Sequence, residues 1–165
     1  MTLSGLVDMH ATVHPVLVNG EAITQEELSL TYQQLPDEYR EQFSEQEVLE
    51  QLIDKVLLLQ EADRRGIVVS SQEVDEFIDE QVAMFGISTQ QLARTLEQAG
   101  MSLDEYRVAV REELVLREFV DTYIFSDLED VSDEQQSAVA AARIEELMQQ
   151  LREDASIVYS PEYQS

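Results

Sequence analysis

The stretch VLVNGEAITQEEL, residues 16–28, holds the signals that decide how the fold begins. Residues 16–18 are apolar and mostly β-branched, so they favour a strand. Asn19-Gly20 is the dipeptide that a two-residue type I′ hairpin turn needs, because both central residues of that turn take positive φ. Residues 21–23 can then return antiparallel to the first strand. A two-stranded hairpin alone is marginal in water, so we expect another element of the chain to pair with it or cover it.

Helix start and stop signals recur along the rest of the chain. Thr24 is followed three residues later by Glu27, which is the spacing of a capping box. The same Ser-x-x-Glu/Gln spacing begins at Ser44, Ser70, Ser88, Ser102 and Ser132. Glycines suited to end a helix in the left-handed conformation stand at Gly66, Gly86 and Gly100. These signals predict helices over residues 25–35, 45–65, 71–85, 89–99, 103–125 and 133–153.

Apolar residues recur at three-and-four spacing in the predicted helices, which indicates one buried face on each. In residues 45–65 the stripe is Val48, Leu49, Leu52, Ile53, Val56, Leu59 and Ala62. In residues 71–85 it is Val74, Phe77, Ile78, Val82 and Phe85. Residues 103–125 carry a broader set that includes Tyr106, Val110, Leu114 and Phe119, so we expect this helix to contact neighbours on two sides.

A further strand is predicted after the last helix. Residues 156–159, Ser-Ile-Val-Tyr, are rich in β-forming side chains and are followed by Pro161. We expect this segment to pair with residues 16–18, which would bring the two ends of the domain into one sheet. The predicted fold class is therefore mainly α, with about six helices and a small β-sheet that joins an N-terminal strand or hairpin to a C-terminal strand.

The length of 165 residues favours one domain. We expect residues 1–15 to form a flexible N-terminal tail, residues 16–160 a single domain and residues 161–165 a C-terminal tail. Within the domain, residues 126–132 form an acidic linker.

The net charge is the extreme feature of the composition. Asp and Glu total 35 against 10 Lys and Arg, a formal net charge of -25, and Lys55 is the single lysine. Such a chain repels phosphate backbones, so we expect no nucleic-acid partner. Acidic, lysine-poor chains resemble proteins of salt-loving organisms, so we predict a halophilic protein with an acidic surface that molar salt stabilises. An acidic protein from an ordinary mesophile is the alternative.

Several classes of site are disfavoured. Cysteine is absent, so disulfides and thiolate chemistry are excluded. His10 and His14 have i,i+4 spacing, but Pro15 argues against a helix there, and the acidic linker lacks the spacing of a calcium loop. No spacing singles out catalytic carboxylates, a Ser/His/Asp set or a phosphate loop. We therefore expect no cofactor, no metal and no enzymatic activity.

Neither a membrane span nor an export signal is visible. The chain has no run of about 20 apolar residues, so we expect no membrane span. Residues 1–15 lack the basic and apolar regions of a signal peptide. The chain is then either cytoplasmic or a form from which an export signal has been removed.

Three stretches carry a family resemblance in their order along the chain. They are VNGEAIT (18–24), LEQLIDKVLLLQEADRRGIVVSSQEVDEFI (49–78) and FGISTQQLARTLEQAGMSLDEYRVAVREELVLREF (85–119). Together, over roughly residues 16–125, they resemble the N-terminal chaperone domain of SurA-type and PrsA-type proteins. The resemblance implies binding of unfolded or extended polypeptide clients and an extracytoplasmic location. Family members commonly insert a parvulin prolyl isomerase domain before the C-terminal helix, whereas here Phe125 and Val139 are too close for one.

The predicted function is an ATP-independent chaperone, a holdase without isomerase activity. Apolar side chains on loops, at helix ends or off the main stripes are the candidate client-binding residues: Tyr32, Leu35, Phe43, Leu58, Met84, Met101 and Leu116. The same residues could simply complete the core. A different function, as an adaptor or assembly subunit, would use this apolar groove for one specific protein partner or for homodimerisation.

Overall fold

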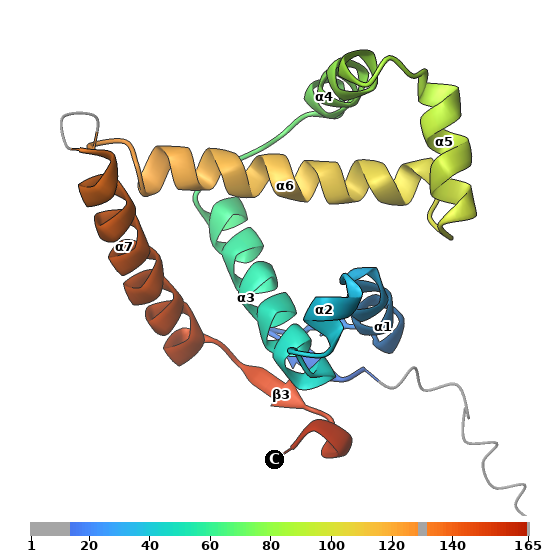
Figure 1. Cartoon of the computed structure of the whole chain (residues 1–165). Coiled ribbons are helices and arrows are strands. Elements are labelled where there is room, and N and C mark those ends of the chain that lie inside the picture. The colour runs from blue at the N-terminus through green and yellow to red at the C-terminus, as the bar shows by residue number, and fades with distance from the viewer. Residues whose placement is uncertain (1–13, 129–131, 165) are drawn as a thin grey trace, which may run out of the picture. The chain divides into compact units, whose positions relative to one another are not determined.

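The computed structural model describes residues 14–128 and 132–164, and they are mainly helical (Figure 1). The strands are β1 (Val16–Val18), β2 (Glu21–Ile23) and β3 (Ile157–Tyr159). The helices are α1 (Gln25–Gln34), α2 (Asp37–Arg40), α3 (Glu45–Arg64), α4 (Ser71–Met84), α5 (Thr89–Gln98), α6 (Leu103–Tyr123) and α7 (Asp133–Asp154), and a 3₁₀ helix spans Pro161–Tyr163. The predicted fold class is confirmed.

The chain divides into two compact units. The first comprises the described residues up to Leu57 together with those from Met148 onward, and the second comprises Leu58–Leu147. The division falls within α3 and within α7. Each unit has apolar clusters of its own. The single domain expected over residues 16–160 stays a prediction, and residues 1–13 of the expected tail lie outside the described residues.

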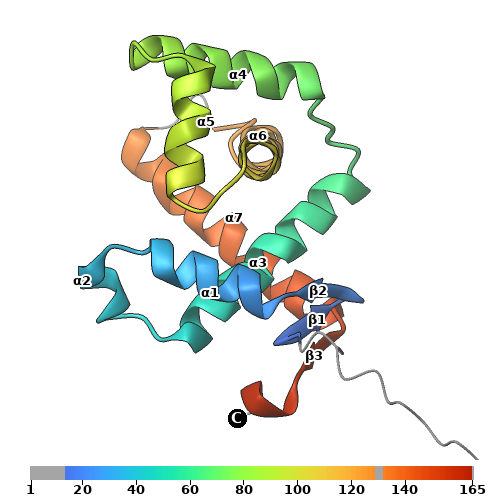
Figure 2. The same ribbon diagram turned by 90° about the vertical axis from the view of Figure 1, so that its right-hand side faces the viewer.

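The strands of the first unit form one antiparallel sheet in the order β2-β1-β3 (Figure 2). Val16 lies opposite Ile23 in one neighbouring strand and opposite Tyr159 in the other. The hairpin and its pairing with the C-terminal strand are therefore both confirmed. The partner that the hairpin needs comes from the far end of the chain.

Asn19 has two roles in this sheet. It takes φ 53° and Gly20 takes φ 86°, as the type I′ turn requires. The Asn19 amide also donates to the Ser156 carbonyl at 2.8 Å, and the Ser156 amide donates to Asn19 Oδ1 at 2.8 Å. One residue thus shapes the hairpin and fixes where the C-terminal strand begins.

The core of the first unit lies between this sheet and helices α1 and α3. Its buried residues are Val16, Val18, Ile23, Leu28, Val48, Leu49, Leu52, Ile53 and Leu57. Half-buried residues from α7, β3 and the 3₁₀ helix pack against this cluster: Met148, Leu151, Ile157, Tyr159 and Tyr163. Tyr163 also donates its hydroxyl to Gln25 at 3.1 Å, so the final described turn is held to α1.

The second unit is built around α4, α5 and α6, which contact one another. Figures 1 and 2 show that α5 lies across the N-terminal end of α6 and that α4 crosses α6. Val69, Val74, Ile78, Val82 and Val110 form one buried cluster between α4 and α6. Ala62, Ile67 and Phe119 form another.

The predicted capping boxes largely account for the helix starts. Ser70, Ser88 and Ser102 each accept from the amide three residues on, and the Glu or Gln at that position bonds back. The helix ends agree with the expected ranges to within two residues. Helix α2 was not predicted, because a four-residue helix that follows Pro36 is too short to show apolar periodicity.

Candidate functional site

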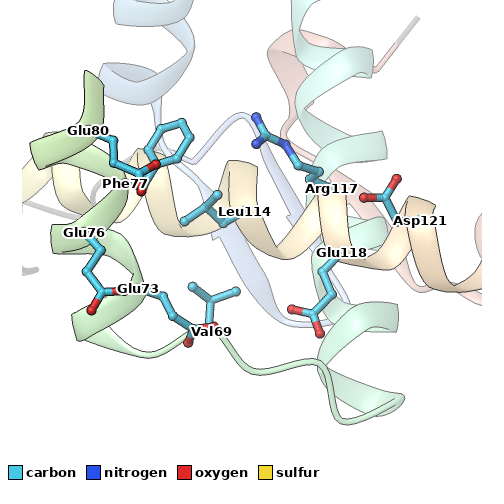
Figure 3. Close-up of a pocket in the computed structure, with 9 residues that line it drawn as sticks. All are labelled: Val69, Glu73, Glu76, Phe77, Glu80, Leu114, Arg117, Glu118 and Asp121. Carbon is cyan, nitrogen blue, oxygen red and sulfur yellow. The ribbon is translucent and has the colours of Figure 1, made fainter. Parts of the chain in front are cut away.

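A pocket of about 390 Å³ lies between α4 and α6 in the second unit (Figure 3). Its lining combines three apolar residues with six charged ones: Val69, Phe77, Leu114, Glu73, Glu76, Glu80, Arg117, Glu118 and Asp121. A neighbouring pocket of about 320 Å³ shares Val69 with it.

Helical spacing brings these side chains to the pocket. On α4 the lining residues fall at positions 73, 76, 77 and 80, and on α6 at 114, 117, 118 and 121. Each set has the i, i+3, i+4, i+7 spacing of one helical face. The capping box at Ser70 fixes where α4 starts and hence which face it presents to α6.

The floor of the pocket continues the apolar core. Val69 is buried, whereas Phe77 and Leu114 are half-buried and pack against the same cluster as Val69. An aromatic ring and two aliphatic side chains thus remain in reach of a ligand without leaving the core. Such a floor binds apolar groups of varied shape, since dispersion and burial are not directional.

Arg117 lies over this floor. Its guanidinium carbon is 5.5 Å from the centroid of the Phe77 ring, a cation–π arrangement between α6 and α4. The same guanidinium donates to Glu113 at 3.3 Å, one turn back on α6. The aromatic floor therefore already accommodates a cation from the protein itself.

The pocket walls are strongly acidic. Five carboxylates and one guanidinium give the lining a net charge of −4. Hydrogen bonds from the Ser70 hydroxyl and amide hold the pKa of Glu73 below its usual range. Glu76 accepts from Gln72 at 2.8 Å. The three others, Glu80, Glu118 and Asp121, are exposed and have no hydrogen-bond or ion-pair partner among the described residues.

An exposed apolar corner follows the end of α4. Met84 is 75% exposed and Phe85 is 72% exposed, and Ile87 adds to them across the turn at Gly86. Met84 lies four residues beyond Glu80 and seven beyond Phe77, so it continues the pocket-lining face of α4. The prediction that Phe85 belongs to the buried stripe of this helix is wrong, because the helix ends just before it and the chain turns away.

The structure distributes the seven predicted client-binding residues over both units. Tyr32, Leu35 and Phe43 pack together against the core of the first unit. In the second unit, Leu58 packs against the cluster that contains Phe119, Met101 and Leu116 are half-buried, and Met84 is exposed. None of the seven lines the α4–α6 pocket, so their role in client binding stays a prediction.

The pocket residues themselves were missed because Phe77 and Leu114 were assigned to buried stripes. A signal was present around Phe77, where Glu73, Glu76 and Glu80 stand at positions −4, −1 and +3. On a helix all three positions lie to one side of Phe77, so carboxylates border this apolar residue along one edge. Acidic residues so close to a stripe mark its edge and an opening to solvent.

The acidic linker, the histidine pair and the expected absence of a membrane span can also be compared with the structure. Asp127 of the acidic linker pairs with Arg143 through contacts of 2.6 and 2.9 Å, and this hydrogen bonding lowers the pKa of Asp127. Within the described ranges, no group of three or more His, Asp or Glu is placed to hold a metal ion. His10 lies outside the described residues. Among the helices of the described chain, none is long and apolar enough to cross a membrane.

These features define a class of mainly helical protein. Strands from both ends of the described chain share one sheet, and two of the helices border an acidic pocket with an apolar floor. Residues 4–120 match the SurA-like N-terminal domain, and the chain belongs to this family.

Similar sequences include proteins named as chaperones. The chain is 32% identical over 111 residues to Chaperone SurA of Saccharophagus degradans. This match covers 61% of the present chain and 25% of the relative. It is 30% identical over 142 residues to Chaperone SurA of Legionella pneumophila strain Lens. That match covers 78% of the present chain and 32% of the relative. The chain thus spans about a quarter to a third of the length of these relatives.

A solved structure from Campylobacter jejuni is also similar. It comes from work on the virulence factor PEB4 and a periplasmic protein, described as two structurally related SurA-like chaperones. The match has a TM-score of 0.49 at 12% sequence identity and covers 90% of this chain and 99% of that chain.

Proposed function

We propose that this chain is an ATP-independent holdase, which binds unfolded or extended polypeptide segments and keeps them from aggregating. The observation that carries the proposal is the α4–α6 pocket, with its half-buried Phe77 and Leu114 between acidic walls. Its volume of about 390 Å³ suits side chains of an extended segment and is far too small for a folded domain. Membership of the SurA-like family supports the same function.

The surface beside the pocket also suits varied clients. Met84 and Phe85 are largely exposed, and methionine adapts its shape to different partners because its side chain is unbranched and polarisable. Exposed apolar side chains that stand together mark binding surfaces more often than isolated ones do, and Met84, Phe85 and Ile87 are close in the chain. The carboxylates around them favour solubility while the apolar surface is unoccupied.

The proposed activity does not include prolyl isomerisation or other catalysis. Residues 124–132 connect α6 to α7, and so short a connection leaves no room at this point for a domain of about 100 residues. We also propose an extracytoplasmic location, on the family resemblance alone, with the cytoplasm as the alternative. Fractionation of cells that produce the natural protein would separate the two compartments.

Light scattering of a chemically unfolded client tests the holdase activity. The client is diluted into molar salt with and without the protein, after circular dichroism has established that the protein is helical in that buffer. We expect suppression of aggregation at near-stoichiometric ratios, without ATP. The proposal fails if the folded protein neither suppresses aggregation nor binds apolar peptides.

An isomerisation assay on a proline-containing peptide completes the test. We expect no acceleration of cis–trans exchange. Acceleration that a point mutation removes without unfolding the protein would make the chain an enzyme.

The adaptor function is favoured by one observation, the compact exposed corner formed by Met84, Phe85 and Ile87. A single folded partner or a second copy could cover this corner. Capture of one stoichiometric partner, together with no response to unfolded clients, would replace the holdase by the adaptor.

A further inference from the structure

The α4–α6 pocket combines two kinds of surface that select for different parts of a ligand. Its floor is apolar and contains an aromatic ring, and its walls carry five carboxylates from two helices (Figure 3). We infer that the pocket selects client segments in which a Lys or Arg stands beside an aromatic or aliphatic side chain. The inference rests on the proposed holdase function and names the substrate class of that site.

The floor and the walls contribute differently to this selection. An apolar client side chain is removed from water on Phe77, Leu114 and Val69, which supplies affinity for any apolar segment. Charge decides between segments, since a client cation is attracted to the walls and a client carboxylate is repelled. The preference therefore depends on the residues that flank the apolar side chain.

Three wall residues have carboxylates available for a client cation. Glu80 on α4 and Glu118 and Asp121 on α6 are exposed and have no hydrogen-bond or ion-pair partner in the described parts of the chain. They come from both helices that border the pocket, so a segment lying along it meets negative charge on either side. A basic side chain gains ion pairs there without breaking an existing one.

Arg117 indicates where the client cation binds. Its guanidinium is 5.5 Å from the Phe77 ring centroid, and its hydrogen bond to Glu113 at 3.3 Å joins two side chains that are both more than half exposed. Such an exposed pair is weak, so the guanidinium can move aside at little cost. A client Arg or Lys can then take the same place over the ring.

The charge of the whole chain disfavours other occupants. A second copy would bring a net charge of -25 toward walls that are already negative. A nucleic acid would be repelled for the same reason. A polypeptide segment with basic and apolar side chains complements both surfaces of the pocket.

Fluorescence anisotropy with three labelled peptides tests the inference. The peptides share one length and one central pair of aromatic residues, which are flanked by Lys and Arg, by Gln, or by Glu. Binding is measured at the lowest salt concentration at which circular dichroism shows the helical fold, and again in 2 M salt. We expect the basic peptide to bind about tenfold more tightly than the acidic one at the lower salt, with the ratio falling in 2 M salt.

Substitutions locate the selectivity. In the triple variant Glu80→Gln, Glu118→Gln, Asp121→Asn, we expect affinity for the basic peptide to fall about fivefold, with little change for the Gln-flanked peptide. The control variant Glu97→Gln, Glu145→Gln, Glu146→Gln makes the same change in net charge at exposed positions outside the pocket, and we expect it to keep most of the preference.

A variant of Arg117 gives an effect of opposite sign. In Arg117→Gln the pocket loses its own cation, so we expect affinity for the basic peptide to rise about two- to threefold. Partial unfolding of the variant would lower its affinity for the basic peptide, so a rise in affinity cannot be an effect of unfolding.

The outcomes separate the inference from the proposed function. If all three peptides bind equally, or if the control triple variant loses as much preference as the pocket variant, the inference is wrong and the holdase proposal stands. If no peptide binds the folded protein, the holdase proposal fails as well.

Discussion

At the scale of single residues, Arg152 links the last helix to α3 in the first unit. Its guanidinium donates to Asp54 at 2.7 Å and to Glu50 at 2.9 Å, and the Tyr159 hydroxyl donates to Glu50 at 2.8 Å. Burial raises the pKa of Tyr159, and its bond to Glu50 adds to this. One guanidinium therefore bridges two carboxylates that stand one turn apart on α3, and it offsets part of their negative charge.

Replacing Arg152 by Gln should destabilise the protein modestly. The three charged side chains remain about one-third exposed, so solvent screens their attraction, and we expect a loss of about 1 kcal/mol in the free energy of unfolding. Arg94→Gln is the matched control, because Arg94 is exposed on α5. Urea denaturation in molar salt measures both, and equal losses would contradict the role given to Arg152.

Glu61 is the charged residue that the described core buries most completely, at 6% exposure. It accepts from Arg64 at 2.6 and 2.7 Å and from Arg65 at 2.6 Å. Hydrogen bonding by Arg64 is the largest cause that lowers the pKa of Glu61; burial opposes it and Arg65 adds to it. Arg65 also lies over the ring of Tyr123 at 4.5 Å, so this cluster joins the end of α3 to α6.

The lowered pKa predicts a pH-dependent effect of Glu61→Gln. A carboxyl whose folded pKa lies below the ordinary value of 4.5 stabilises the fold fully above that pH and loses the contribution as pH falls through the folded pKa. We expect the variant to be about 1–2 kcal/mol less stable at pH 7 and pH 5.5, with a smaller difference at pH 3. Urea denaturation at the three pH values, with Glu97→Gln as control, would contradict this if the difference did not shrink in acid.

At this scale, turns set by neighbouring residues could be predicted from the sequence, whereas bonds between residues far apart in the chain could not. Asn19-Gly20 specifies its turn through backbone conformation alone, so it is visible in the sequence. The bonds from Arg152 to Glu50 and Asp54 join residues about 100 positions apart, and any of the 35 acidic residues could have been the partner. Only the packing of α7 on α3 selects these two.

At the scale of elements, caps determine where the helices begin and therefore which face each one presents. Helix α4 is the example that matters for function, because Ser70 and Glu73 form its capping box and Glu73 also lines the pocket. A shift of one residue would rotate Phe77 and Glu80 by about 100° around the helix axis. The six predicted helices were found because caps and apolar stripes agree with each other.

Removing the cap of α4 should loosen the pocket wall. For Ser70→Ala we expect a loss of about 1 kcal/mol in the free energy of unfolding and faster hydrogen exchange at the first amides of α4. Ser137→Ala in the interior of α7 is the control, and it should be neutral or slightly stabilising because alanine is the better helix former. Unchanged exchange at the start of α4 would contradict the importance of the cap.

The apolar floor of the pocket could not be predicted from α4 alone. Phe77 and Leu114 occupy stripe positions in their own helices, and a stripe shows only that a face is covered by something. Whether it is fully covered depends on how α4 crosses α6. That crossing leaves one edge of each stripe half-buried, at Phe77 and Leu114, and so produces the pocket.

At the scale of the whole molecule, net charge is the dominant property. A charge of -25 on 165 residues makes like charges repel across the surface, and this repulsion opposes folding at low ionic strength. Molar salt shortens the screening length from about 10 Å to about 3 Å, which removes most of the repulsion. We propose that the protein is adapted to high salt on this ground.

Thermal unfolding should therefore depend strongly on salt. We expect the midpoint temperature to rise by about 10 °C or more between 0.1 M and 2 M KCl, because screening removes repulsion that is stronger in the compact state than in the expanded unfolded chain. A near-neutral helical protein measured in parallel corrects for general salt effects. A midpoint that is indifferent to KCl would favour the acidic mesophile protein instead.

The most direct test of the central claim is to locate a bound client. A photo-cross-linking amino acid is placed at position 80 or 118 in the pocket walls, or at position 97 or 146 as exposed controls, and each protein is irradiated with a labelled unfolded client. We expect strong cross-links from positions 80 and 118 and weak ones from the controls. Equal cross-linking at all four positions, or none in the pocket by a protein that suppresses aggregation, would show that clients bind elsewhere.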